Sequence, residues 1–336
     1  MKVEEQMYVG DKVSNTGNNS ANIKERCNKG YQAISQIKVT LKELNFGRFS
    51  IQTGLILRNS ILVSKMLLNS EVWHALSKSQ VEQLEKIDRS LLRNILDAHC
   101  KTGNDWLMAD TGILNLGSLI QIRRLMYWWH ICNRNANELI HRVYLSQRLS
   151  PSHGDWVKLL DYDRNELGIT LADEDMQTVG KETFKKFVKK KVKQKLVRQI
   201  LEGKSKKSKS AKLDCVDIKT AEYLSDTRFT TKQKQILFKL RSRTLDVKEN
   251  FKFQYTNLWC ETCGLFVETQ AHLLQCPELV KDLHYVDVTL SQVDEKLIYG
   301  NADQQLKIVK IYCDILDKRN EILSSTRRAQ CTLPNK

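Results

Sequence analysis

Proline is scarce in this sequence, which has only three prolines in 336 residues, where average usage would give roughly seventeen. Proline interrupts helices and favours turns, so its scarcity argues against a loop-rich or β-rich fold. Lys, Leu and Gln, which favour helices, are abundant, and long segments lack clusters of turn residues. The composition therefore predicts a mainly α protein.

Long apolar runs are also missing. No run approaches the ~18 residues that a membrane-spanning helix needs, so we expect no transmembrane helix and no membrane partner. The N-terminus, MKVEEQMYVG, lacks the apolar segment of a secretory signal. We therefore expect an intracellular protein, nuclear or cytoplasmic, whose nine cysteines are reduced and available as metal ligands.

Charge of one sign is concentrated in a single segment. Residues 181–212 contain fourteen Lys and Arg but only two Glu, a balance of +12 out of a net +15. Within this segment, apolar residues recur at helical spacing and leave most lysines on the other faces. The apolar stripe consists of Phe184, Val188, Val192, Leu196 and Ile200. The pattern predicts a basic helix that docks on the protein and turns its cations toward a polyanionic partner.

The stretch CETCGLFVETQAHLLQC gathers three cysteines and a histidine with the spacing Cys260-x2-Cys263-x8-His272-x3-Cys276. Cysteines two residues apart can offer both thiolates to one metal, and residues four apart share a face if they lie on one helical turn. Thiolate and imidazole ligands in a tetrahedron select Zn²⁺, and four protein ligands leave no open position. We therefore expect one structural Zn²⁺. The alternative is a group of buried free cysteines beside an unrelated histidine, and His284 is a nearby substitute ligand.

The same segment, extended to CETCGLFVETQAHLLQCPEL, resembles the C-terminal zinc-binding segment of non-LTR retrotransposon reverse transcriptases. Three upstream stretches resemble the same family in the expected order. They are MYVGDKVSNTGNNSANIKERCNKGYQAISQI, near the end of the polymerase domain, LRNSILVSKMLLNSEVWHALSKSQVEQLEKIDRSLLRNIL, in the thumb-like region, and GILNLGSLIQIRRLMYWWHI, which follows the thumb. The resemblance covers nearly the whole chain and implies descent from an RNA-directed DNA polymerase.

The catalytic motifs of that family are absent. Its polymerases hold two Mg²⁺ ions with an Asp-Asp turn and a third aspartate, and this sequence contains no Asp-Asp pair. The Pro-Asp pair of the downstream endonuclease is also missing, and there is no room for an N-terminal endonuclease. The chain begins after the position expected for the catalytic strands. We therefore expect no enzymatic activity.

Periodicity and resemblance together divide the chain into six parts. We expect a polymerase-domain remnant with a connecting helix at 1–48, a helical thumb-like domain at 49–150, a linker at 151–180, a basic helix with a flexible basic linker at 181–212, a helix with the CCHC zinc knuckle at 213–285, and a terminal helix with a tail at 286–336.

The lysines of the basic helix have the density expected for phosphate contacts, with affinity from counterion release and not from base reading. Arg123 and Arg124, with Trp128 and Trp129 one turn on, offer cations and stacking faces, although the tryptophans are also good core residues. A solvated face or a nuclear localisation signal is the alternative for the lysines. The candidate nucleic-acid-binding residues are Lys185, Lys186, Lys189, Lys190, Lys193, Lys195, Arg198, Arg123 and Arg124.

These observations favour a noncatalytic module that holds template RNA or target DNA and has no small-molecule substrate. One alternative is a relict or protein-interaction product in which the zinc knuckle only stabilises a subdomain. Another is an active polymerase whose Asp-Asp turn comes from a partner chain. Salt-dependent binding to nucleic acid distinguishes the first hypothesis from the second.

Overall fold

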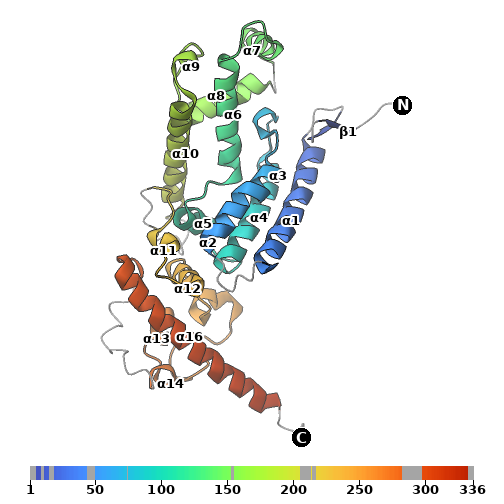
Figure 1. Cartoon of the computed structure of the whole chain (residues 1–336). Helices are drawn as coiled ribbons and strands as arrows, with labels where there is room; N and C mark the ends of the chain where they lie inside the picture. The colour runs from blue at the N-terminus through green and yellow to red at the C-terminus, as the bar shows by residue number, and fades with distance from the viewer. Residues whose placement is uncertain are drawn as a thin grey trace. The chain divides into compact units, whose positions relative to one another are not determined.

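The computed structural model describes residues 5–8, 11–14, 19–43, 50–73, 75–152, 155–204, 213, 217–281 and 297–331 (Figure 1). The fold is mainly α, as the composition predicted. Strands β1 (Glu5–Tyr8) and β2 (Asp11–Ser14) form an antiparallel hairpin near the N-terminus. The chain separates into two compact units. Unit 1 comprises Met1–Gly47, Thr53–Leu92 and Thr111–Lys219, and unit 2 comprises Arg48–Gln52, Arg93–Asp110 and Thr220–Lys336.

Long helices form most of unit 1. Its elements are α1 (Ser20–Glu43), α2 (Ile51–Leu57), a π-helix (Arg58–Val63), α3 (Ser64–Met66), a 3₁₀ helix (Ser70–Val72), α4 (Lys78–Leu96), α6 (Leu116–Cys132), α7 (Leu139–Leu149), α8 (Trp156–Leu167), α9 (Asp175–Thr178) and α10 (Lys181–Lys204). The first residues of α2 and the last of α4 belong to unit 2. The predicted basic helix is therefore present as α10.

The core of unit 1 explains where α10 sits. Helix α10 packs against α6 and α8, and Figure 1 shows α6 and α10 side by side. All five residues of the predicted apolar stripe, from Phe184 to Ile200, are at most 2% exposed. Trp128 of α6 is fully buried, and its indole N–H donates to Asp173 at 2.8 Å. Burial of a continuous stripe fixes the rotation of α10 about its axis, so the remaining faces carry the lysines.

A buried ion pair holds the π-helix of unit 1 to α4. The Arg58 guanidinium donates to both carboxylate oxygens of Asp88, at 2.7 and 2.5 Å, and both side chains are almost fully buried. Arg58 also donates to the Leu114 carbonyl at 3.2 Å. These bonds satisfy a charge that would otherwise be costly to bury.

Shorter elements make up unit 2. They are α5 (Asn104–Thr111), α11 (Glu222–Ser225), α12 (Thr231–Arg241), a 3₁₀ helix (Lys248–Gln254), α13 (Gln270–Leu273), α14 (Pro277–Val280) and α16 (Ala302–Cys331). Helix α16 packs against α11, α12 and α14. None of the helices in the described part of the chain is long and apolar enough to cross a membrane.

A polar cluster organises the core of unit 2. Arg241, near the end of α12, pairs with the Asp110 carboxylate at 3.0 Å, and the Tyr223 hydroxyl donates to the same carboxylate at 2.7 Å. Helix α12 begins with a capping box in which the Thr230 hydroxyl accepts from the Gln233 N–H and the Gln233 side chain accepts from the Thr230 N–H. These contacts fix α12, which in turn packs on α16.

Candidate metal centre

A short hairpin presents the first two cysteines. We call residues 258–280 the knuckle. Trp259 and Val267 form an antiparallel bridge, and the Cys260 N–H donates to the Phe266 carbonyl at 2.7 Å. The chain reverses at Gly264, whose φ of 69° is the left-handed conformation that glycine adopts without a steric cost. The Gly264 N–H donates to the Cys260 carbonyl at 2.9 Å, which closes the turn. The hairpin thereby brings both thiols to the same side.

Two short helices present the other two ligands. His272 lies in α13, and its backbone N–H donates to the Thr269 hydroxyl at 2.8 Å. Helix α13 ends at Leu273, and Cys276 is the residue immediately before α14. Our expectation that His272 and Cys276 share one helical turn is therefore wrong. Pro277 disfavours helical backbone at the residue before it, so Cys276 is extended and a new helix begins after it.

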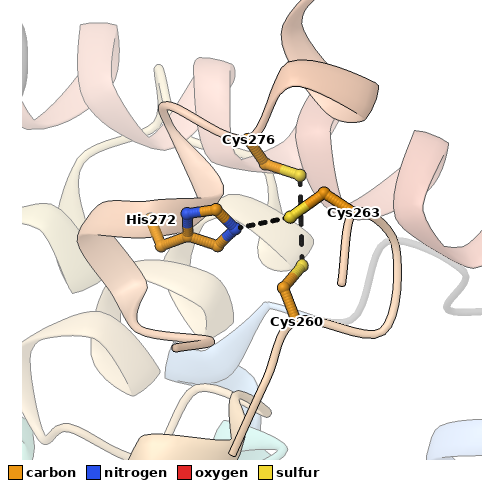
Figure 2. Close-up of side chains that lie close together, drawn as sticks. All are labelled: Cys260, Cys263, His272 and Cys276. Carbon is orange, nitrogen blue, oxygen red and sulfur yellow. Dashed lines mark hydrogen bonds between the residues drawn. The ribbon is translucent and has the colours of Figure 1, made fainter. Parts of the chain in front are cut away.

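The four side chains converge, as Figure 2 shows. The Cys263 Sγ lies 3.4 Å from the His272 Nε2, and the Cys260 Sγ lies 3.9 Å from the Cys276 Sγ. All four ligand atoms lie within 4.8 Å of one another. A tetrahedral ion with bonds of about 2.0–2.3 Å requires ligand atoms roughly 3–4 Å apart, so a small contraction completes the shell. The predicted convergence is confirmed, and this cluster can bind one metal ion.

The protonation chemistry of the cluster suits a cation. Burial disfavours the charged form of His272, so its pKa lies below the ordinary value and its imidazole is neutral, as a ligand must be. Burial alone would raise the pKa of Cys263, but hydrogen bonds to its sulfur bring the pKa below the ordinary value. They come from the Leu265 N–H, from the Cys260 and Cys276 side chains and from the Phe266 N–H. Burial raises the pKa of Cys276 to about 11, so a cation is required to hold this group as a thiolate.

Glu268 and Gln270 attach the knuckle to α16. The Glu268 carboxylate is completely buried, and the Arg319 guanidinium donates to it at 2.5 Å. The Tyr312 hydroxyl donates to the Gln270 carbonyl at 3.0 Å. The second oxygen of Glu268 accepts from the Glu261 N–H at 3.3 Å, inside the hairpin. The local sequence gives no signal for these supporting residues, because Arg319 is 51 positions from Glu268 and no local pattern relates them.

The predicted cations of α10 fall into two groups. Lys186, Lys189 and Lys190 are exposed and, with half-exposed Lys193, line a shallow depression of about 640 Å³. Among the described residues, these four ammonium groups have no ion-pair partner. The others are arranged differently. Lys195 pairs with Glu166 at 2.6 Å, Lys185 lies 3.4 Å from Glu182, and Arg198 is exposed.

The predicted arginine pair lies inside unit 1. Arg124 is only 7% exposed and pairs with Asp163 at 2.5 Å. Arg123 is half-buried and donates to the Leu67 carbonyl. Trp128 is buried, and the Trp129 indole donates to the Val179 carbonyl at 2.8 Å, so both tryptophans serve the core. Arg123 and Arg124 are thus engaged in contacts within unit 1, unlike the exposed lysines of α10.

Several predicted features lie outside the described residues: the basic linker at 205–212, His284, and residues 286–296 of the C-terminal part. No protein-family model, curated protein or solved structure matches this chain.

Proposed function

We propose that this chain is a noncatalytic nucleic-acid-binding module that contacts the phosphate backbone through α10. The observation that carries the proposal is the division of α10 into two faces. Its apolar stripe is buried, whereas Lys186, Lys189, Lys190 and Lys193 line one depression and form no ion pair among the described residues, although Asp217 lines the same depression. Four ammonium groups against one carboxylate leave an excess of positive charge on this surface, which creates a positive local potential.

The spacing of these lysines supports contact with a polyanion. They occupy helical positions that differ by three or four residues, so they follow one stripe along α10. Seven residues separate the first from the last, which is ~10.5 Å along the helix axis. A nucleic acid strand running beside this stripe brings several phosphates within reach of flexible lysine side chains, without any reading of bases.

We further propose that the metal in the knuckle is Zn²⁺ and that its role is structural. Three thiolates and one neutral imidazole are the donors that Zn²⁺ prefers, and four protein ligands leave no position for a reactant. The residues that would hold the ion are Cys260, Cys263, His272 and Cys276. Metal analysis of purified protein is expected to give about one zinc per chain, with Zn–S bonds near ~2.3 Å.

The sequence resemblance supports a further proposal about the family to which the chain is related. We propose that the chain is related to the part of a non-LTR retrotransposon reverse transcriptase that runs from the thumb to the zinc knuckle. Knuckle residues that match the family pattern have structural roles: Glu268 binds Arg319, Thr269 caps α13, and Pro277 is the first residue of α14. Purified protein supplied with primer–template, Mg²⁺ and nucleotides is expected to show no primer extension, because the Asp-Asp turn is absent.

Salt-dependent binding tests the role of α10. If four to six lysines engage phosphates, a plot of log K against log salt on duplex DNA is expected to have a slope of roughly −4 to −5. Replacement of five lysines with Gln is expected to weaken binding to all sequences alike and to flatten this slope. The five are Lys185, Lys186, Lys189, Lys190 and Lys193. The fold should change little, because exposed charges contribute little to stability.

A matched control removes the same charge from other places. Lys24, Lys38, Lys101, Lys307 and Lys310 are all exposed and lie outside α10. Their replacement with Gln is expected to leave the slope close to that of the original protein. If both variants weaken binding equally, the affinity comes from net charge and not from α10. If neither does, α10 is a solvated face or a targeting signal.

A further inference from the structure

Exposed aromatic rings are concentrated beside and on the knuckle. Of the six exposed aromatic side chains in the described residues, four lie between positions 253 and 266. Phe253 is 95% exposed, Trp259 50% and Tyr255 37%. We call these three residues the aromatic surface. The fourth, Phe266, packs against the His272 ring at 5.6 Å and so belongs to the metal site. Large rings that are left in water mark a surface for a partner.

Cations lie over two of these rings. The Lys252 ammonium lies 5.5 Å from the centre of the Phe253 ring, and the Lys248 ammonium lies 5.8 Å from the centre of the Tyr255 ring. Lys248 also donates to the Trp259 carbonyl at 2.9 Å, which links the second ring to the knuckle. An exposed ring of this kind suits a partner with a flat π face, and a nucleobase has one.

Tyr255 also lines a polar pocket of about 230 Å³. Lys248 and Arg319, both more than nine-tenths buried, supply donors, while Asp246 and Glu261 supply acceptors. The Nε of Arg319 has no hydrogen-bond partner among the described residues. The pocket thus joins a stacking face to a mixture of donors and acceptors.

The donors and acceptors that line the pocket favour some classes of ligand over others. An isolated phosphate would meet two carboxylates as well as two cations, and an apolar side chain would desolvate polar walls without hydrogen bonds in return. A nucleobase offers donors and acceptors along its edge and a flat face for Tyr255. In a duplex both features are occupied by pairing and stacking, so only an unpaired base can enter.

We infer that the aromatic surface and the pocket beside Tyr255 bind an unpaired base of single-stranded RNA or DNA. This inference rests on the proposed function, since it names the form of nucleic acid that the module prefers. Residues 248–281 carry three Lys and four Glu, so this surface neutralises no net phosphate charge. It therefore contributes affinity that does not depend on salt, whereas the contribution of α10 does.

The test separates the two contributions. Phe253, Tyr255 and Trp259 are replaced with Leu, which keeps apolar area but removes the π faces. Binding of oligo(dT) and oligo(rU) is expected to weaken by at least about fivefold for each stacked ring lost, with an unchanged salt slope. Binding to a duplex of the same length is expected to be unchanged. Zinc content and circular dichroism report whether the knuckle still folds.

A control variant trims aliphatic side chains in the same hairpin, with Leu265→Ala and Val267→Ala. It is expected to bind single strands like the original protein. Equal weakening in both variants would mean a general apolar contact, as in a protein interface, and would overturn the inference. Unchanged single-strand binding by the ring variant would also overturn the inference. If the five-lysine variant still lost binding in that case, the proposed role of α10 would stand. No nucleic-acid binding by the original protein would overturn both.

Photocrosslinking keeps the inference falsifiable if the ring variant does not fold. Oligo(dT) and oligo(rU) carrying 5-iodouracil are irradiated with the unaltered protein, and crosslinked peptides are identified by mass spectrometry. Crosslinks are expected at Phe253, Tyr255 or Trp259. Crosslinks confined to residues elsewhere in the chain would overturn the inference.

Discussion

Helix α10 and the knuckle hold their surfaces in place by different means. The stripe of α10, from Phe184 to Ile200, is at most 2% exposed, so burial of apolar area holds this helix. The knuckle leaves Leu265, Phe266 and Val267 exposed and is closed by four potential metal ligands. Unit 1 is thus held by a buried core, whereas the exposed hairpin of the knuckle lies beside a cluster that can bind one metal ion. Three perturbations that act on only one of the two test this difference.

Loss of a ligand is expected to have the largest effect. Cys260→Ser, or treatment with a strong chelator, is expected to unfold the knuckle, because zinc binding contributes about 10–16 kcal/mol in zinc-finger peptides. Hydrogen exchange followed by mass spectrometry should show lost protection at 258–280 and retained protection in α6 and α10. Cys100→Ser alters an exposed cysteine outside the cluster and serves as the control. Unchanged protection in the knuckle would contradict a structural metal site.

Breaking a buried ion pair is the corresponding perturbation of unit 1. Arg58→Ala leaves the Asp88 carboxylate buried without its partner, and a loss of about 3–5 kcal/mol in the free energy of unfolding is expected. Urea unfolding, monitored by hydrogen exchange in α4, measures this loss. The effect is expected to be the same with and without zinc.

A double variant serves as the control for Arg58. Arg58→Met with Asp88→Leu removes both charges and keeps apolar volume, so it is expected to recover most of the lost stability. A double variant as unstable as the single one would mean that packing around Arg58, and not the uncompensated carboxylate, causes the loss.

A smaller, pH-dependent effect is expected at Glu85. Burial raises its pKa to about 7, while the Gly117 N–H, which donates to it at 2.9 Å, acts in the opposite direction. The folded protein therefore holds this proton more tightly than the unfolded chain, whose carboxyl titrates near 4.5. The free energy of unfolding is thus expected to fall as the pH rises from about 4.5 to about 7.

Glu85→Gln stays neutral and retains an acceptor for Gly117. It is expected to exceed the original protein in stability by about 1–3 kcal/mol above pH 7 and to match it near pH 4. Thermal unfolding across this range measures the difference. A pH-independent effect of Glu85→Gln would contradict the raised pKa.

The features that the sequence predicted correctly depend on the spacing of residue types within one short segment. The apolar stripe of α10 repeats every three or four residues, and the convergence of Cys260, Cys263, His272 and Cys276 follows from ligand pairs at both ends of a short segment. The aromatic surface also had a signal, because FKFQYTNLW contains four aromatic residues among polar ones, and three of the four form this surface. We did not use that signal.

The features that sequence missed are long-range polar contacts. The local sequence suggests that Arg124 is an exposed cation, but in the structure it donates to Asp163, which is 39 positions away. Arg319 and Glu268 are related in the same way. Nothing in the local pattern shows that a charge has a distant buried partner. The helix break at Cys276 is different, because a local signal for it existed. Pro277 disfavours helical backbone at Cys276, although the four-residue spacing between His272 and Cys276 suggests one helical turn.

Closure by four ligands has an evolutionary consequence. Few substitutions are expected to be tolerated at the four ligands, at Gly264 and at Glu268, whereas many are expected to be tolerated at the exposed residues between them. Substitutions at positions such as Leu265 leave the fold almost unaffected, so the knuckle can acquire a new binding preference in single steps. The stripe of α10 has no such freedom, since any larger or smaller side chain there disturbs close packing. The exposed residues of the knuckle are therefore expected to diversify, while the buried stripe that positions α10 remains constant.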